Sequence, residues 1–282
     1  MEDIDRERCK DHFSHLILDQ LSRCQLISDQ EVVYQSQRTH IYDTYTSQLI
    51  QQGLLYRCNC SRAQIWSARL ASTTGSPQNT SSFAGLVYPG TCRNIPPLLE
   101  STQAHGALSE DHWLGKSFAL RIKTSPQTLD WWDRRLGPGA QDVGAEVGDF
   151  VIKRSDGPYS YQLCVVADDI EQCVTHIVRG EDLADNTPRQ ILLYQLFQHR
   201  PPTYMHVPLV KNKDGDKLSK QTLAPALDLD SMDKIIQTMK SAASHLGLQS
   251  TESTNCSLES LLQNWTHQWS LINPLTSPPI DH

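Results

Sequence analysis

Residues 174–198 read "VTHIVRGEDLADNTPRQILLYQLFQ", and residues 204–210 read "YMHVPLV". The opening letters of the first stretch are apolar and rich in β-branched residues, which predicts a strand. The letters after "GEDLA" predict a helix, with Asn186 or Thr187 at its N-cap and Pro188 in its first turn. The second stretch predicts another strand. Strand, helix and strand in this order favour an α/β core with helical crossovers.

The flanking sequence continues this alternation. Apolar residues at helical spacing predict one helix over Arg6–Gln25 and another from Thr39 or His40 to Gln52, the second ending before Gly53. Two apolar stripes after Pro225 predict two further helices, at 235–246 and 258–269.

The middle of the chain predicts fewer regular elements. "SFALRIKT" (117–124) predicts a strand, and "DFVIKRSDG" (149–157) a strand that ends in a tight turn before a second apolar segment. Leu70–Phe83 is rich in Ser and Thr and predicts a mobile loop, and 93–112 predicts irregular chain. We therefore expect a loop-rich insert at about 55–145 within the α/β core.

Composition limits the class of protein. The 282 residues are 38% hydrophobic and 20% charged, which is typical of a globular chain of one large domain or two lobes. The net charge of −7 argues against a non-specific nucleic-acid binder, although a local basic patch could still grip RNA. No apolar run is long enough to span a membrane, and the chain opens with "MEDIDRERCK" where a signal peptide would be apolar. We therefore expect a cytoplasmic protein.

Three of the eight cysteines have a spacing that suggests a metal site. Cys58 and Cys60 are one residue apart, so a disulfide between them would be strained. With Cys92 they could offer three thiolates to zinc, at about 2.3 Å each. Spacing alone leaves the fourth ligand open between Tyr88, His105, a water and none. Three buried thiols without a metal are the alternative.

A lysine-rich loop follows the second strand and reads "KNKDGDKLSKQ" (211–221). It places Lys217 and Lys220 three residues apart, with Ser219 between them. Cationic side chains at the end of a strand suit phosphate oxygens whose charge grows in a transition state. A solvated charged turn is an equal alternative.

Three other polar features are ambiguous when each is taken alone. Arg179 ends a strand, where its guanidinium could bind a carboxylate through two hydrogen bonds, but an ion pair with Glu181 or Asp182 is preferred on this residue alone. Tyr161 could offer its hydroxyl to a small polar ligand or could simply pack in the core. The opening "MEDID" supplies three carboxylates and by itself indicates a solvated terminus.

Together these motifs resemble one family. "EDID", "CNC…YPGTC", "YQLCVVADD", "THIVRGEDLADNTPRQILLYQLF" and "DKLSKQ" occur in the order seen in class I glutamyl-tRNA synthetases. The resemblance runs from about Glu2 to Ala226 and is greatest to the short glutamyl-queuosine tRNA(Asp) branch. Only a short stretch follows Pro225, where a full glutamyl-tRNA synthetase carries a large anticodon-binding region. The implied fold is α/β, a Rossmann-like class I catalytic core with a zinc-bearing insert and a short helical C-terminal region.

The resemblance implies an ATP-dependent ligase. The α-carboxylate of glutamate attacks the α-phosphate of ATP, pyrophosphate leaves, and the glutamyl group passes to the queuosine base of tRNA(Asp). "KLSKQ" matches the KMSKS-type loop of the family. Lys220 is therefore implied to contact ATP, which acts with magnesium, and to stabilise the leaving pyrophosphate, with Lys217 and Ser219 as further catalytic residues.

The resemblance also assigns the remaining site residues. Arg179 and Tyr161 match the arginine and tyrosine that bind glutamate, and Glu2 matches the acidic residue that faces the substrate ammonium. The Cys-x-Cys…Tyr-x3-Cys pattern matches the zinc site of the family. The implied ligands of one structural zinc are Cys58, Cys60, Tyr88 and Cys92.

The expected division of the chain follows the family. It comprises the remainder of the first Rossmann half at 1–55, the zinc-bearing insert at 56–147, the second Rossmann half with the lysine loop at 148–226, and a helical region at 227–282. In the family a first strand and a HIGH-type helix precede "EDID", whereas here Met1 stands directly before Glu2. We therefore expect the core to lack both, because the true start lies about forty residues upstream or because the chain is a decayed copy. Intact downstream motifs favour the first explanation.

Two alternative functions follow from the same pattern. The chain could be a non-catalytic zinc- and tRNA-binding remnant, or a fragment of an enzyme that charges tRNA(Glu). We expect a monomer that contacts no membrane, with glutamate, ATP and queuosine-bearing tRNA(Asp) as its partners.

Overall fold

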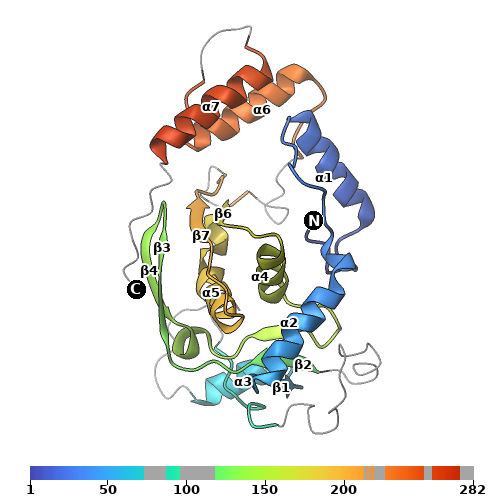
Figure 1. Ribbon diagram of the computed structural model, residues 1–282, viewed down its shortest axis with the longest axis vertical. Coiled ribbons are helices and arrows are strands. Elements are labelled where there is room, and N and C mark those ends of the chain that lie inside the picture. Colours follow the sequence, from blue (N-terminus) through green and yellow to red (C-terminus); the bar gives the residue numbers. More distant parts are fainter. Residues whose placement is uncertain are drawn as a thin grey trace.

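The computed structural model describes residues 1–72, 87–95, 118–212, 215, 217–218, 226–250 and 256–273, without the side chains of 69–72 (Figure 1). Ser219 and Lys220 of the lysine loop lie outside these residues, as does His105.

The predicted strand–helix–strand unit forms part of a four-stranded sheet in the order β4-β3-β7-β6. β6 (His176–Gly180) and β7 (Thr203–Val207) are parallel neighbours, and α5 (Thr187–Leu196) connects them. The α/β prediction is therefore confirmed. β7 ends just before Pro208, which has no N–H to continue a ladder. The carboxyl ends of β6 and β7 lie at the same edge of the sheet, where sites of α/β folds gather.

The start of α5 differs in detail from the prediction. Asn186 occupies the N-cap position, but its side chain makes no cap hydrogen bond. Its Oδ1 instead accepts hydrogen bonds from Gln162 and from Nη1 of Arg189, at 2.9 Å in the second case. Pro188 in the first turn, which needs no N–H partner there, accounts for the helix start.

The apolar segment after the predicted turn is a helix, α4 (Tyr161–Glu171). β5 (Val151–Lys153) leads into the turn, where Gly157 has a φ of 112° and its N–H bonds to the Arg154 carbonyl at 3.2 Å. The helix begins at Ser160, whose hydroxyl accepts from the N–H of Leu163. Its inner face packs with α5 and with α2 (Thr39–Gln51) in the main core. α2 ends as predicted, next to Gly53 with a φ of 69°.

A second, antiparallel sheet has three strands in the order β1-β2-β5. β1 (Leu55–Cys58) pairs with β2 (Ala119–Ile122), and β2 pairs with β5. α3 (Arg62–Ser72) follows β1, so the predicted mobile loop is wrong at 70–72; the rest of 70–83 lies outside the described residues. Of the predicted irregular segment, only 93–95 is described.

A β-hairpin within the expected insert was not predicted. β3 (Thr128–Asp133) and β4 (Gly137–Asp142) pair antiparallel, and Asp133 of β3 is also the parallel partner of Tyr204 in β7. Pro138 is acceptable because β4 is an edge strand. A Cβ on Gly139 would lie 2.3 Å from the indole of Trp131 opposite, so glycine is required for this close packing. The insert is therefore not loop-rich in its described part, and strands pair across the expected boundary at 147.

The remaining helices lie at one end of the molecule (Figure 1). α6 (Met232–His245) and α7 (Leu258–Ile272) confirm the two C-terminal predictions and pack through residues such as Ala243 and Trp265. α1 (Asp11–Arg23) is shorter than the predicted 6–25, because the chain makes a separate turn at Asp5 before it. Among the helices of the described residues, none is long and apolar enough to cross a membrane.

Candidate active site

Arg179 stands near the carboxyl end of β6 and is partly buried. Its Nε donates to His206 Nε2 at 3.0 Å, and its Nη1 donates to Gln190 Oε1 at 2.7 Å. Its Nη2 donates to Thr187 Oγ1 at 3.0 Å and to the Leu183 carbonyl at 3.3 Å. The guanidinium is therefore held in one orientation by neutral acceptors.

The alternative ion pairs of Arg179 are not the ones observed in the described residues. Glu181 pairs with Arg135, and Asp182 pairs with Lys217. The positive charge of Arg179 thus has no directly bonded carboxylate among its four acceptors. A cation whose acceptors are all neutral is suited to binding an anion.

Tyr161 and Glu2 lie within the electrostatic field of Arg179. Burial raises the pKa of the Tyr161 hydroxyl, Glu2 raises it further, and Arg179 opposes the rise. Burial also raises the pKa of the Glu2 carboxyl, while the terminal ammonium lowers it, Asp168 raises it and Arg179 lowers it. Glu2 is exposed as a whole residue, yet its carboxyl is close enough to feel these charges. Tyr161 and Arg179 are thus in hydrogen-bond contact, and the charge of the Glu2 carboxylate acts on Tyr161.

Sequence analysis missed the residues that hold Arg179. Thr187 and Gln190 are 0% and 1% exposed, although both are polar. They are three residues apart on α5, so they face the same side as its buried apolar residues. Polar residues at core positions of a helix were the available signal.

The described part of the lysine loop folds back toward the end of β6. Lys211 and Lys217 form an antiparallel bridge, and the N–H of Leu218 bonds to the Val210 carbonyl at 2.9 Å. The ammonium of Lys217 forms its ion pair with Asp182, three residues after Arg179. Lys217 is thus placed beside the candidate site, while the predicted roles of Ser219 and Lys220 stay predictions.

The cysteine cluster forms a compact group. The Sγ atoms of Cys58, Cys60 and Cys92 all lie within 4.8 Å of one another, and those of Cys60 and Cys92 are 3.5 Å apart. The Tyr88 hydroxyl is 3.3 Å from Cys58 Sγ and 3.5 Å from Cys60 Sγ. All eight cysteines are free thiols, so no disulfide competes for these sulfurs.

This geometry fits a tetrahedral metal site. Zinc–sulfur bonds of about 2.3 Å place tetrahedral sulfurs roughly 3.8 Å apart, close to the separations found here. Tyr88 is 6% exposed, and its hydroxyl also accepts the N–H of Cys92 at 2.9 Å. A cluster of three cysteines that could hold a metal is therefore present, with the Tyr88 oxygen next to it.

Comparison with known protein families identifies the chain. The family model described as "tRNA synthetases class I (E and Q), catalytic domain" matches residues 1–268. The chain belongs to this family. It is thus an aminoacyl-tRNA synthetase-type ligase by descent, with the α/β catalytic core of class I.

Several relatives of this synthetase have high identity. A "Glutamyl-Q tRNA(Asp) synthetase" of Albidiferax ferrireducens is 41% identical, over 95% of this chain and 86% of the relative. A "Glutamyl-Q tRNA(Asp) synthetase" of Thiobacillus denitrificans is 44% identical, over 80% of this chain and 67% of the relative.

A solved structure shows the same fold. A glutamate tRNA ligase from Elizabethkingia meningosepticum, in complex with its amino acid, has a TM-score of 0.60 and 22% identity, covering 78% of this synthetase and 44% of that chain. This synthetase therefore spans less than half the length of that ligase.

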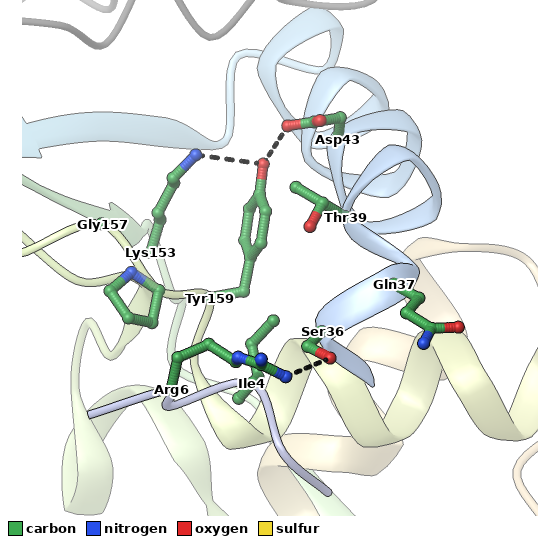
Figure 2. A pocket seen from close by; sticks show the side chains of 10 residues that line it. Ile4, Arg6, Ser36, Gln37, Thr39, Asp43, Lys153, Gly157 and Tyr159 are labelled. Atoms are coloured by element: carbon green, nitrogen blue, oxygen red, sulfur yellow. Dashed lines mark hydrogen bonds between the residues drawn. The ribbon is translucent and has the colours of Figure 1, made fainter. Parts of the chain in front are cut away.

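Two cavities are lined by the segment that leads into α4 of this synthetase. The larger, of about 630 Å³, is shown in Figure 2, where Lys153 and Asp43 both bond to the Tyr159 hydroxyl. Its ten lining residues include none of the predicted site residues. The smaller, of about 350 Å³, is lined by Tyr161 together with Arg121, Arg189 and others. The smaller cavity is thus the one that contains a predicted glutamate-binding residue.

A buried carboxylate fixes α4 of this synthetase against α2. Asp168 accepts hydrogen bonds from Gln35 at 3.0 Å, from Arg38 at 2.7 Å, and from the Tyr42 hydroxyl at 3.0 Å to each oxygen. It is 7% exposed. The negative charge of Asp168 also raises the pKa of the Glu2 carboxyl, so the contact between the helices acts electrostatically on the candidate site.

The neighbouring Asp169 has a raised pKa of about 6. Burial is the main cause; the Tyr194 hydroxyl, which donates to Asp169 Oδ2 at 3.2 Å, partly offsets it, while Asp168 raises the pKa further. Between pH 4 and 6 the folded state therefore keeps a proton that the unfolded chain has released, since the ordinary pKa is 3.8. The free energy of unfolding falls as the pH rises through this window.

Replacing Asp169 by Asn should remove this penalty. We expect Asp169→Asn to raise the free energy of unfolding at pH 7 by about 1–2 kcal/mol, a value discounted for partial exposure, and to flatten its pH dependence between 4 and 6. Urea unfolding at pH 4, 5, 6 and 7 measures both effects. Asp19→Asn, at a side chain that is 62% exposed, is the matched control. Equal slopes in the parent and Asp169→Asn would contradict the assignment.

Proposed function

We propose that this protein activates glutamate with ATP and transfers the glutamyl group to the queuosine base of tRNA(Asp). The observation that carries this proposal is the convergence of Glu2, Tyr161 and Arg179. Glu2 offers a carboxylate to the ammonium of an amino acid, and Arg179 offers a guanidinium to a carboxylate. Tyr161 adds one hydroxyl, and the residue also lines the smaller cavity.

In the first step, an α-carboxylate oxygen of glutamate attacks the α-phosphorus of ATP. The bond from phosphorus to the bridging oxygen breaks, and pyrophosphate leaves with the electron pair. Lys220, with Lys217 and Ser219, stabilises the charge that grows on the pyrophosphate oxygens, and magnesium accompanies ATP. The position of Lys217 beside the end of β6 supports this role.

In the second step, a nucleophile of the modified base attacks the acyl carbon and AMP leaves. The names of the relatives support tRNA(Asp) as the acceptor, since both are glutamyl-Q tRNA(Asp) synthetases at more than 40% identity. A reaction that needs ATP and tRNA takes place where both are found, which we propose is the cytoplasm.

The cysteine cluster is proposed to hold one structural zinc. Cys58, Cys60 and Cys92 would bind it through sulfur and Tyr88 through oxygen. Four protein ligands leave no open position, which is the arrangement of a structural site. The zinc would fix the segment around β1 rather than take part in glutamate transfer.

The proposed function is tested with purified protein, ATP, labelled glutamate and two tRNA preparations. We expect glutamate-dependent exchange between ATP and pyrophosphate, and transfer of label to tRNA(Asp) from queuosine-containing cells. The same tRNA from queuosine-deficient cells is the matched control and should stay unlabelled. Label on tRNA(Glu) instead would identify a tRNA(Glu)-charging enzyme, and absence of any exchange would exclude glutamate activation.

A further inference from the structure

Two buried residues connect Arg179 to the interior of the sheet. His206 lies opposite Arg179 in the pairing of β6 with β7, and Asp133 lies at the end of β3, on the other side of β7. Both are 1% exposed. A histidine and a carboxylate in the middle of a sheet are costly to bury unless they are paired. The presence of both at buried positions therefore suggests that the pair has a role.

The hydrogen bonds determine the tautomer of His206. Asp133 Oδ2 is 2.5 Å from His206 Nδ1, and Asp133 also accepts the N–H groups of Arg135 at 3.0 Å and Leu136 at 2.8 Å. Burial raises the pKa of the Asp133 carboxyl, but the hydrogen bonds from Leu136, His206 and Arg135 lower it by more, so the carboxylate is ionised at neutral pH. It therefore accepts the Nδ1–H of the ring, and Nε2 is left with a lone pair.

That lone pair faces Arg179. Nε2 of His206 accepts the Nε–H of Arg179 at 3.0 Å. The five N–H groups of a guanidinium then have acceptors for four, because Gln190, Thr187 and the Leu183 carbonyl take three more. The Tyr161 hydroxyl is a further hydrogen-bond partner of the guanidinium, so a ligand carboxylate would meet Arg179 beside Tyr161. A bidentate contact would need one acceptor to give way, and the longest of these bonds is that to the Leu183 carbonyl, at 3.3 Å.

We propose that His206, with its tautomer set by Asp133, is a positioning residue that orients Arg179 toward the carboxylate of the substrate. This inference rests on the proposed glutamate activation. Asp133, His206 and Arg179 come from three adjacent strands. The orientation of the guanidinium is therefore fixed by the sheet rather than by a loop. A residue that acts in this way should affect the binding of glutamate and leave the binding of ATP alone.

Two amide substitutions separate positioning from a merely structural role. The amide nitrogen of Asn lies near the place of Nδ1, so His206→Asn keeps a donor for Asp133 and loses the acceptor for Arg179. The amide of Gln reaches near the place of Nε2, so His206→Gln can present an oxygen to Arg179 and leaves Asp133 without its side-chain donor. Positioning predicts that Asn impairs glutamate binding more, whereas a structural role predicts that Gln is the more damaging change.

The experiment measures glutamate-dependent ATP–pyrophosphate exchange and the melting temperature of each full-length variant. We expect His206→Asn to raise the KM for glutamate about 10-fold, with the KM for ATP and kcat changed less than about twofold. His206→Gln should recover most of the glutamate KM although it melts at a lower temperature. His199→Asn, at an exposed histidine, is the control. Equal glutamate KM values in the two variants, or the reverse order, would overturn the proposal.

A third variant keeps the test decisive if either histidine variant fails to fold. Asp133→Asn preserves the size of the side chain, but its amide can donate to Nδ1 of His206 and so favours the Nε2–H tautomer. The Nε2–H of His206 and the Nε–H of Arg179 would then be two donors that face each other. We expect a rise in the glutamate KM and a change of the His206 tautomer in nitrogen NMR of labelled histidine. An unchanged tautomer and KM would refute the mechanism. A parent protein without glutamate-dependent exchange would refute the proposed function itself, and this result is distinct from an active parent with unaffected variants.

Discussion

Replacing Arg179 by alanine is expected to lower kcat/KM for glutamate about 1000-fold, which corresponds to about 4 kcal/mol. The change removes the charge that would pair with the substrate carboxylate. It also leaves His206, Gln190 and Thr187 without the donor they now share, so the pocket loses its order together with its charge. The dependence of ATP–pyrophosphate exchange on glutamate concentration measures the effect.

Arg179→Lys is the matched control because it keeps the charge. A single ammonium cannot reach all four acceptors that surround the guanidinium, so we expect an activity between those of the parent and the alanine variant. The KM for ATP should change little in both. A kcat/KM for glutamate within tenfold of the parent in a folded Arg179→Ala protein would rule out the proposed contact.

Removal of the proposed zinc should have the largest effect on stability. Cys58, Cys92, Tyr56 and Tyr88 form a small cluster of buried residues that is separate from the main core. Structural zinc contributes about 10–16 kcal/mol in small zinc-finger peptides, comparable with the whole stability of a typical domain. We expect Cys58→Ser to lose the metal and to unfold the region around β1 at a temperature well below the parent transition.

Metal analysis and thermal unfolding test this expectation together. The freshly purified parent should contain about one equivalent of zinc, and a chelator should reproduce the melting curve of Cys58→Ser. Cys173→Ser, at an exposed thiol outside the cluster, should keep both the metal and the transition temperature. Less than about half an equivalent in the parent, or full metal content in Cys58→Ser, would refute the zinc proposal.

The sequence predicted elements with strong local signals. The helix ending next to Gly53 and the strand–helix–strand unit around α5 are confirmed, because capping glycine, proline in a first turn and β-branched runs act over a few residues. The β3–β4 hairpin was missed because its second strand contains "GPG", which indicates a loop unless the strand is known to lie at an edge.

The candidate site was only partly predictable, for a related reason. The resemblance indicated Glu2, Tyr161 and Arg179 as a group, although they are far apart in sequence, and in the structure the charges of Glu2 and Arg179 both act on Tyr161. Asp133 and His206 are 73 residues apart and carry no joint motif, so only the pairing of β3 with β7 shows that they interact. Spacing could likewise not place Tyr88 next to the cysteines, whereas in the structure its hydroxyl is 3.3 Å from Cys58 Sγ and 3.5 Å from Cys60 Sγ.

The pairing of β3 with β7 also limits how the chain can be recombined. An engineer could exchange the cysteine-bearing segment between homologues as one unit, using the expected insert boundaries at about 56 and 147. Such a chimaera would take the residue at position 133, which contacts His206 beneath Arg179, from the other homologue. The exchange would then alter amino-acid recognition as well as the cysteine segment. A graft that ends before Thr128, and so leaves the hairpin with its native sheet, would exchange the cysteine segment while retaining that support.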